Sequence, residues 1–309
     1  MAGLACASRL RDSGCTVSVI DKGRGAGGRM ATRRLETACG MAQADLGAPF
    51  FSAHDPGFAQ MVEHWARQDL VAPWPEAGTG QWTAIPAMNA ILKHLAAPLD
   101  VRFGCMVKAL ARDERRWWVL TDAGRLGPFD AVILAIPAEQ AAPLLSLHDF
   151  DQARAALSVP MLPCWTAIYV FDQRLPVASS HLEGGGVIER AIRNSGKPGR
   201  TGPETWVVQA GAGWSADHLE WMAADVGDHL LQALSAMVGQ PLPQPISRSV
   251  HRWRYARPAQ GGRLMLWNDN LRIGACGDWL EGTTVEAAWL SGMAAAGHVT
   301  KTACADRAW

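Results

Sequence analysis

The chain alternates short apolar runs with amphipathic stretches, which is typical of a mixed α/β protein. Apolar residues recur at helical spacing over residues 2–13, and residues 16–20 (TVSVI) follow as a β-branched strand. The continuous apolar run at 129–137 (FDAVILAIP) indicates a parallel strand buried on both faces. The pattern therefore predicts a parallel sheet with covering helices.

Three later stretches have the i, i+3, i+4, i+7 periodicity of amphipathic helices. They are residues 56–70, 88–95 and 215–239, the last with Ser215 as its N-cap. Residues 194–203 (NSGKPGRTGP) are predicted to form a flexible loop. Further strands are expected at residues 101–103, 106–110, 117–121, 165–171, 205–210, 250–256 and 272–276.

Composition narrows the classes of protein. Lys plus Arg and Asp plus Glu each number 29 among 309 residues, so the net charge is zero and favours neither nucleic acid nor an anionic membrane surface. The length allows two domains or one large one. Seven cysteines without a C-x-x-C pair support neither a disulfide framework nor a metal site. With no cleavable signal and no long apolar run, the expected compartment is the cytoplasm.

The first 32 residues have the pattern of a dinucleotide-binding βαβ unit without its opening strand. Asp21 closes the strand at 16–20, where an acidic residue binds the adenosine ribose, and Gly3 precedes it by 18 residues, as the last glycine of G-x-G-x-x-G would. Alternatively, Met1 is the true start and Gly3 an ordinary glycine. If the first strand is missing, we expect weak or absent binding of the dinucleotide cofactor and rescue by about a dozen upstream residues.

A glycine-rich basic segment, residues 22–34 (KGRGAGGRMATRR), follows Asp21 directly. Its glycines permit close approach of the backbone to a ligand, and its four arginines supply charge for a pyrophosphate. The alternative is a flexible basic loop, which its position after the ribose acid makes less attractive.

The string D-K-G-R-G-x-G-G-R-M-x-T-R, preceded by A-G-L-A-C-A, resembles the N-terminus of renalase-like flavoproteins, within the flavin amine oxidase group. The resemblance implies an α/β protein with a discontinuous Rossmann-like FAD-binding domain and a mixed-sheet substrate domain with helices. The expected FAD-binding domain comprises residues 1–60, 96–142 and 264–309, and the substrate domain residues 61–95 and 143–263.

Other segments carry the same resemblance. Residues 44–51 (ADLGAPFF) are similar to a D-x-G-A-x-x-F segment that passes near the flavin ring, although Pro49 replaces a polar residue. Gly277-Asp278 resembles a C-terminal G-D motif, followed by a helix whose N-terminus points at the flavin. The implied cofactor-binding residues are Gly3, Asp21, Lys22, Gly27, Gly28, Arg29, Met30, Asp45, Gly47, Ala48, Val107, Gly277, Asp278, Thr284 and Val285.

Candidate substrate contacts are aromatic. Residues 250–256 (VHRWRYA) form a strand that places His251, Trp253 and Tyr255 on one face, either bordering the substrate cavity or packed in the core. Phe51 and Trp82 are further candidates, because a flat pocket lined by tryptophan suits a nicotinamide ring. No residue is identified as catalytic.

The resemblance implies hydride transfer from a small substrate to flavin N5 and reoxidation by molecular oxygen to hydrogen peroxide. Renalase-like proteins oxidise isomers of dihydronicotinamide, which are therefore the first expected substrates. Oxidation of another amine and non-catalytic flavin binding are the alternatives. No nucleic acid, membrane or obligate protein partner is expected.

Overall fold

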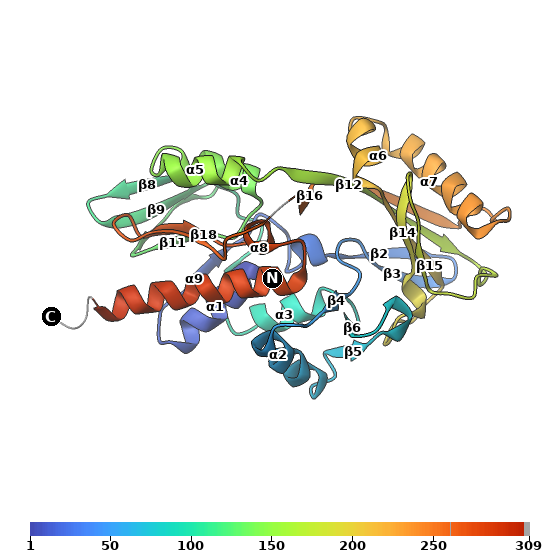
Figure 1. Ribbon diagram of the computed structural model, residues 1–309, viewed down its shortest axis with the longest axis horizontal. Coiled ribbons are helices and arrows are strands. Elements are labelled where there is room, and N and C mark those ends of the chain that lie inside the picture. The colour runs from blue at the N-terminus through green and yellow to red at the C-terminus, as the bar shows by residue number, and fades with distance from the viewer. Residues whose placement is uncertain (260, 306–309) are drawn as a thin grey trace. The chain divides into compact units, whose positions relative to one another are not determined.

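A computed structural model of the chain describes residues 1–259 and 261–305 (Figure 1). The chain divides into two compact units, which are described separately. Unit 1 comprises Met1–Ala26, Leu92–Met161 and the described residues from Arg257 onward, and unit 2 comprises Gly27–Ile91 and Leu162–Ala256. No helix in the described residues is long and apolar enough to cross a membrane.

Unit 1 contains short parallel strands in two separate sheets. One pairs β1 (Ser18–Ile20) with β7 (Asp100–Arg102). The other pairs β11 (Val132–Leu134) with β18 (Ile273–Ala275), and β17 (Leu266–Asn268) joins β18 in antiparallel orientation. Among the described residues, the second edges of β1 and β11 have no strand partner.

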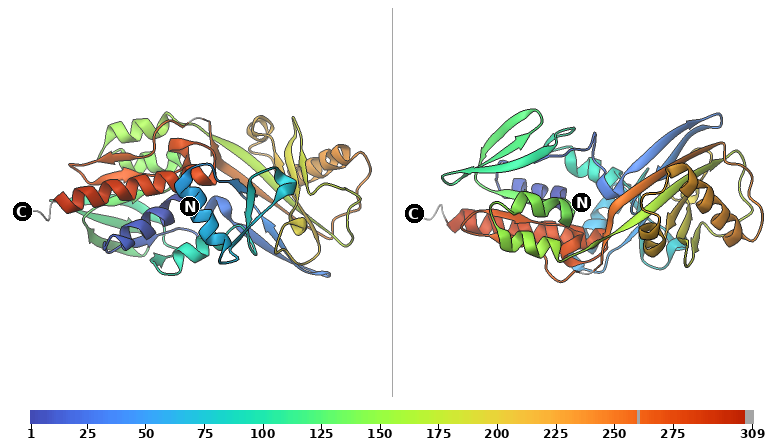
Figure 2. Two further views of the ribbon diagram at one scale, coloured as in Figure 1. Left: turned by 60° about the horizontal axis from the view of Figure 1, so that its bottom comes forward. Right: turned by 90° about the horizontal axis from the view of Figure 1, so that it is seen from above.

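Helices α1 (Ala2–Asp12) and α9 (Val285–Ala305) pack against each other in unit 1 (Figure 2). Their contact is close at Gly292, where a Cβ atom would lie 2.2 Å from the carbonyl oxygen of Ala2. Apolar residues of both helices share a buried cluster with Cys276, which follows β18. The amphipathic pattern of the first helix is thus satisfied by a partner from the far end of the chain.

The rest of unit 1 consists of an antiparallel sheet and two helices. The sheet contains β8 (Val107–Asp113), β9 (Arg116–Thr121) and β10 (Gly124–Phe129). Helices α4 (Ala138–Leu145) and α5 (Phe150–Leu157) pack together.

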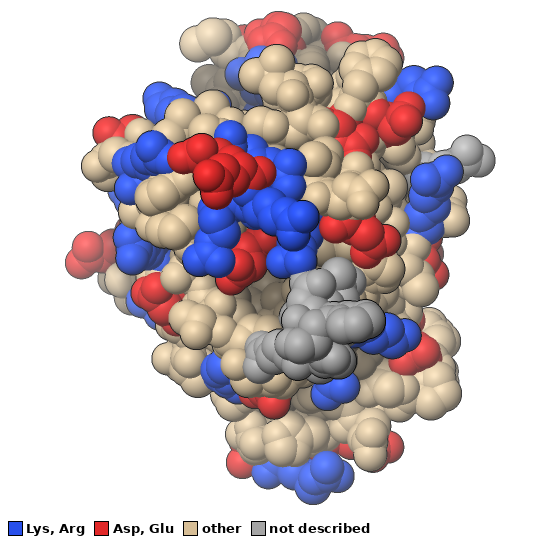
Figure 3. Space-filling view, turned by 90° about the vertical axis from the view of Figure 1, so that its left-hand side faces the viewer, with Lys and Arg blue, Asp and Glu red and all other residues tan. Residues whose placement is uncertain are grey.

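On the face drawn in Figure 3, basic and acidic side chains are interspersed, in keeping with the zero net charge.

Unit 2 is built on a five-stranded sheet in the order β13-β14-β15-β12-β16. These strands are β12 (Met161–Phe171), β13 (His181–Glu183), β14 (Ile188–Arg193), β15 (Glu204–Ala210) and β16 (Ser247–Pro258). Alternate residues of β12 face opposite ways: Tyr169 packs in a cluster with α7 (Ala223–Val238), and Ile168 packs against the hairpin of β2 (Thr32–Thr37) and β3 (Gly40–Asp45). The sheet is therefore covered on both faces.

Unit 2 also contains several shorter helices and strands, of which α3 extends into unit 1. They are η1 (Gly28–Met30), β4 (Phe51–Ser52), α2 (Pro56–Ala66), β5 (Val71–Pro73), η2 (Pro75–Ala77), β6 (Gln81–Ala84), α3 (Ala90–Ala96), η3 (Asn194–Gly196) and α6 (Ala212–Asp217). Unit 1 also contains the short helix α8 (Asp278–Glu281).

The predicted domain boundaries differ from these units. Residues 27–60 belong to unit 2, because the β2–β3 hairpin packs on the five-stranded sheet. Residues 143–161 belong to unit 1, where the Gln152 side chain of α5 donates to the carbonyl of Ile273 in β18 at 3.1 Å. Local hydrophobic patterns could not specify these distant partners.

Two predicted elements are also corrected. The helix expected at 215–239 is two helices, α6 and α7, because the backbone at Met222 is extended (ψ 137°) and begins a new helix there. The expected N-cap, Ser215, instead lies buried within α6, where its hydroxyl accepts a hydrogen bond from the Trp165 amide at 3.0 Å. Met222, an apolar residue of the expected helix, is 71% exposed. The strand expected at 129–137 is shorter, since β10 ends at Phe129 and β11 covers only three residues.

We predict that Gly292→Ala lowers the free energy of unfolding by about 1–3 kcal/mol, because the added methyl group forces α1 and α9 apart. Gly297→Ala, in the same helix with no atom within 4 Å of the new methyl group, is the matched control and is expected to raise stability by about 0.5–1 kcal/mol. Urea denaturation of both variants measures the difference. Equal effects would contradict the close contact.

Candidate functional site

Unit 1 places Asp21 at the carboxyl end of β1, as the dinucleotide pattern predicted. Its amide donates to the Arg102 carbonyl at 2.9 Å, and its carbonyl accepts from Cys105 at 3.0 Å. The Gly23 amide donates to Oδ1 at 2.7 Å, whereas Oδ2 has no hydrogen-bond partner in the described part of the chain. The carboxylate is thus fixed in orientation and keeps one oxygen for a hydroxyl ligand.

Gly3 lies where the first turn of α1 approaches the end of β11. A Cβ atom at Gly3 would lie 2.8 Å from that of Ala135, so the close approach requires glycine. The Lys22 ammonium donates to the Gln140 side chain at 3.2 Å and thereby links the end of β1 to α4. Val107 is the first residue of β8.

The C-terminal motif is anchored from α9. The Gly277 amide donates to the Ser291 hydroxyl at 2.8 Å. Asp278 begins α8, not the long helix, which starts at Val285. The Thr284 hydroxyl accepts from the backbone N–H of the third residue of α9 at 3.0 Å and so caps that helix. Gly277 follows a parallel strand, as Asp21 and Ala135 do, and such strand ends are where α/β sheets bind ligands.

Unit 2 brings the G-G-R segment against the segment that follows Asp45. Gly27 immediately precedes η1, which contains Gly28, Arg29 and the buried Met30. The Ala48 amide donates to the carbonyl of Arg29 at 2.8 Å. A Cβ atom at Gly47 would lie 1.8 Å from that same carbonyl oxygen, so only glycine fits. The G-G-R segment and the residues after Asp45, which are separated in the sequence, therefore contact each other through their backbones.

Residues 46–49 form a turn, called here the 46–49 turn, that is also held from other sides. The Trp253 indole donates to the Leu46 carbonyl at 3.2 Å, and Gln209 donates to the Gly47 carbonyl at 2.7 Å. The Lys197 ammonium donates to the carbonyl of Pro49 at 2.7 Å. In the described residues, no partner is assigned to the Gly47 N–H or the Ala48 carbonyl, so one donor and one acceptor remain for a ligand.

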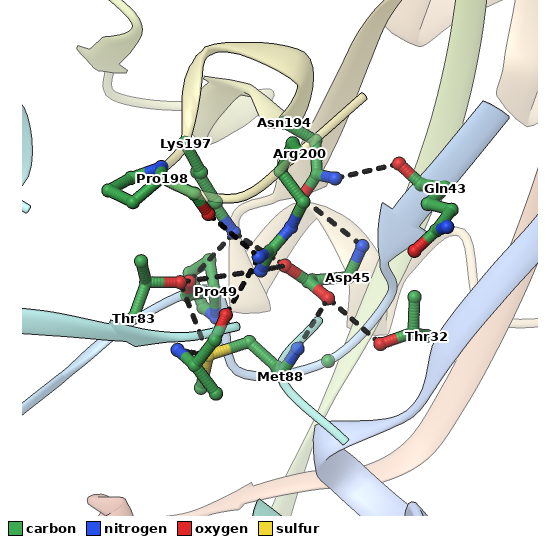
Figure 4. A network of polar contacts seen from close by, with 12 residues as sticks. Thr32, Gln43, Asp45, Pro49, Thr83, Met88, Asn194, Lys197, Pro198 and Arg200 are labelled. Atoms are coloured by element: carbon green, nitrogen blue, oxygen red, sulfur yellow. Dashed lines mark hydrogen bonds and ion pairs between the residues drawn. The ribbon is translucent and has the colours of Figure 1, made fainter. Parts of the chain in front are cut away.

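Asp45, which precedes the 46–49 turn, is completely buried at the centre of a polar network (Figure 4). Its Oδ1 accepts from the Thr32 hydroxyl and the Met88 amide, both at 2.9 Å. Its Oδ2 accepts from Lys197 at 2.9 Å and from Arg200 at 2.6 Å. Because both oxygens are fully used, the expectation of a direct cofactor contact is corrected: Asp45 supports the turn instead.

The network contains one anion and two cations, all with side chains no more than 1% exposed. Burial alone would raise the pKa of Asp45, but the charges of Lys197 and Arg200, with the hydrogen bonds from Arg200 and the Met88 amide, lower it from 3.8 to about 2. Complete burial lowers the pKa of Lys197 from 10.5 to about 8; Asp45 opposes that shift and Arg200 adds to it. The cost of burying the carboxylate is thus offset by its cations and hydrogen bonds, whereas the cost of burying the lysine charge is not fully offset.

The predicted substrate residues fall into two groups within unit 2. Phe51 is 3% exposed and pairs with Trp82 across β4 and β6, so Phe51 is a core residue and its predicted substrate contact is corrected. Trp82 lines a pocket of ≈ 260 Å³. The rings of His251 and Trp253 lie 4.4 Å apart on β16, with Tyr255 half-buried on the same strand. In the described residues, no ring contact joins the two groups.

Lys197 and Arg200 were not among the predicted site residues, because their segment has the composition of a flexible loop. The observed loop is anchored: Asn194 is completely buried and donates to the Gln43 carbonyl at 2.7 Å. Local composition carries no signal for this burial, because lysine and arginine are mostly exposed residues and their buried partners are distant in the sequence.

Comparisons with known proteins agree with the motifs. Residues 75–300 match the family model of flavin containing amine oxidoreductases, and residues 1–65 match that of NAD(P)-binding Rossmann-like domains. Mouse renalase is 24% identical over 291 residues, which cover 83% of this chain and 82% of renalase.

Two solved structures are similar in fold. Cyclohexylamine oxidase from Brevibacterium oxydans aligns with a TM-score of 0.69 and 13% identity over 97% of this chain and 96% of the oxidase. A putative protoporphyrinogen oxidase from Exiguobacterium aligns with a TM-score of 0.59 and 19% identity over 72% of this chain. This chain spans only 53% of the length of that second protein.

We predict an acid-dependent loss of stability from Asp45. Its folded-state pKa lies below the unfolded value of 3.8, so its stabilisation is fully present above pH 3.8 and is lost as the pH falls through about 2. The shift corresponds to about 2 kcal/mol. Urea unfolding between pH 2 and 6 should show this slope in the wild type and in Asp113→Asn, at an exposed position, but not in Asp45→Asn. The same slope in Asp45→Asn would rule out this role.

Proposed function

We propose that this chain, which belongs to the flavin-containing amine oxidoreductase family, is an FAD-dependent oxidase of a small molecule. The family match spans more than half of the chain, which makes the protein a flavin-dependent oxidoreductase. FAD is the proposed form of the flavin, and isomers of dihydronicotinamide are the proposed substrates. The similarity to mouse renalase along 83% of the chain supports that choice.

The observation that carries the proposal of FAD is the geometry of Asp21. The carboxylate follows a parallel strand, is fixed through one oxygen by the Gly23 amide, and keeps the other oxygen unpaired in the described residues. A flavin mononucleotide has no adenosine ribose for such an acid to bind, whereas FAD does. Close packing at Gly3 and the anchored Gly277 support the same interpretation.

In unit 2, the residues proposed to bind the cofactor are backbone groups of the G-G-R segment and of the 46–49 turn. Their positions are set by hydrogen bonds to Arg29, Gln209 and Trp253. Such a rigid backbone fits a planar ligand that needs fixed donors and acceptors, because pre-organised groups lose little entropy on binding.

A bound FAD would supply the redox chemistry, namely acceptance of a hydride from the substrate and reduction of oxygen by two electrons and two protons to hydrogen peroxide. The chain is then required to hold and orient the reactants and to exclude water. Because the cofactor would carry out the redox step, the chain needs no catalytic acid–base pair, and none was identified among the sequence motifs. The half-buried His251–Trp253 pair offers an aromatic surface for a flat substrate.

Oxidation of an amine is the second candidate, favoured by the description of the matched family. The two candidates make different demands on the substrate, because one requires an N-heterocyclic ring and the other only a carbon–hydrogen bond beside nitrogen.

Turnover distinguishes these functions. The purified chain, supplied with FAD, is mixed without oxygen with dihydronicotinamide isomers, cyclohexylamine or putrescine, and the flavin absorbance is followed. We expect bleaching by a dihydronicotinamide isomer, and one peroxide per turnover when oxygen is admitted. Bleaching by an amine alone would establish the second candidate, and bound FAD that no compound reduces would contradict both.

A further inference from the structure

Lys197 occupies a costly position beside the 46–49 turn. Its side chain is fully buried, although an ammonium group is among the groups least suited to burial. Asp45 already has a second cation, Arg200, on the same oxygen. The three side chains together carry one net positive charge, so removal of Lys197 would leave a neutral, paired cluster.

Lys197 and Arg200 share an oxygen but support different segments. Arg200 donates to the carbonyl of Ala84 at 2.7 Å, at the end of β6. Lys197 instead donates to the carbonyl of Pro49 at 2.7 Å. Figure 4 shows both side chains reaching Asp45 from one loop while contacting separate carbonyl groups. Lys197 is therefore the side chain of this loop that fixes the 46–49 turn.

The bond to Pro49 matters because of what the turn presents. The Ala48 amide is held by Arg29, and the carbonyls on either side of Ala48, at Gly47 and Pro49, are held by Gln209 and Lys197. With these groups directed into the protein, the Gly47 N–H and the Ala48 carbonyl are left for a ligand. A hydrogen bond from a charged donor is roughly twice as strong as one from a neutral donor, which suits a carbonyl that must not turn outward.

We propose that Lys197 is a positioning residue for the cofactor site, retained for the shape it gives the 46–49 turn and not for the stability of unit 2. The inference rests on the proposed function, because it assigns the turn to cofactor binding. It predicts that stability and cofactor affinity respond in opposite directions when Lys197 is replaced. A residue with a purely structural role would lower both together.

Lys197 also makes the free energy of unfolding depend on pH. The charged and titratable groups that face it are Asp45 from β3, Arg200 from its own loop and His181 from β13, while Trp74 adds an uncharged ring 5.4 Å from the ammonium. Burial lowers the pKa of His181 below 6.5, so His181 is neutral above pH 8. Of these groups, Lys197 is the one that changes charge between pH 8 and 10.5.

The sign of this effect follows from linkage. The folded lysine releases its proton near pH 8 and the unfolded lysine near 10.5, so the unfolded state binds more protons between these values. The free energy of unfolding therefore rises with pH across this window. At pH 7 the folded protein bears the full cost of the buried charge.

The test compares the wild type with Lys197→Met, with Lys197→Gln, which keeps a neutral donor, and with Lys93→Met at an exposed lysine as control. We expect Lys197→Met to be at least as stable as the wild type in urea at pH 7 and to lack the rise between pH 8 and 10.5. Without FAD, exchange of its Ala48 amide should be about tenfold faster, and its dissociation constant for FAD about tenfold higher. Lys197→Gln should be intermediate, and Lys93→Met unchanged.

Two results would overturn the inference. One is a less stable Lys197→Met whose amides exchange faster throughout unit 2, which would make the role structural. The other is unchanged Ala48 exchange and unchanged FAD affinity. If neither this chain nor one extended by about a dozen upstream residues binds FAD, the proposed function fails, whereas exchange at Ala48 still shows whether Lys197 holds the turn.

Discussion

One buried carboxylate determines how several segments of unit 2 meet. Water solvates a carboxylate strongly, so Asp45 can be buried only where hydrogen bonds and positive charges replace that water. Thr32 and Met88 satisfy one oxygen, and Lys197 and Arg200 satisfy the other. Strand β2, the segment before α3 and the 194–200 loop must therefore converge on Asp45, and the backbone that follows it has little freedom.

The 46–49 turn inherits this constraint and adds others. Gly47 is pressed against the Arg29 carbonyl so closely that no larger residue fits. Side chains from β15 and β16 hold the adjoining carbonyls. An oxidoreductase whose cofactor performs the electron transfer needs accurately placed contacts more than it needs acids and bases. A turn whose shape is over-determined by the surrounding protein meets that need.

Local patterns predicted much of the fold. Helices α1 and α2 and strand β16 follow from apolar periodicity, as do the inward-facing Val226, Leu230 and Leu234 of α7. The dinucleotide pattern placed Asp21 at the end of β1, where the structure has it, whereas the contact between the G-G-R segment and the 46–49 turn became evident only in the structure. The helices, the strands and the position of Asp21 could be predicted because the periodicity of helices and strands, and the positions that require glycine, are visible in residues close together in the sequence.

Features that depend on distant partners were not predictable in this way. Lys197 is buried only because Asp45, 152 positions earlier, is there to receive it. Ser215, expected to cap a helix, instead lies within α6 and accepts a hydrogen bond from the Trp165 amide, 50 positions earlier. Trp253, proposed as a substrate contact, donates to the 46–49 turn. In each case the side chain's role is set by a tertiary contact that composition does not encode.

We have proposed that the 46–49 turn is held in advance to receive the flavin. The most direct test is amide exchange of Gly47, Leu46 and Ala48 with and without saturating FAD. Leu46 and Ala48 already donate to Ala31 and Arg29, so their exchange should be slow in both states. Exchange of the Gly47 amide is expected to slow when FAD is added, because the flavin would accept a hydrogen bond from it. Unchanged exchange at Gly47 in a chain that demonstrably holds FAD would contradict it.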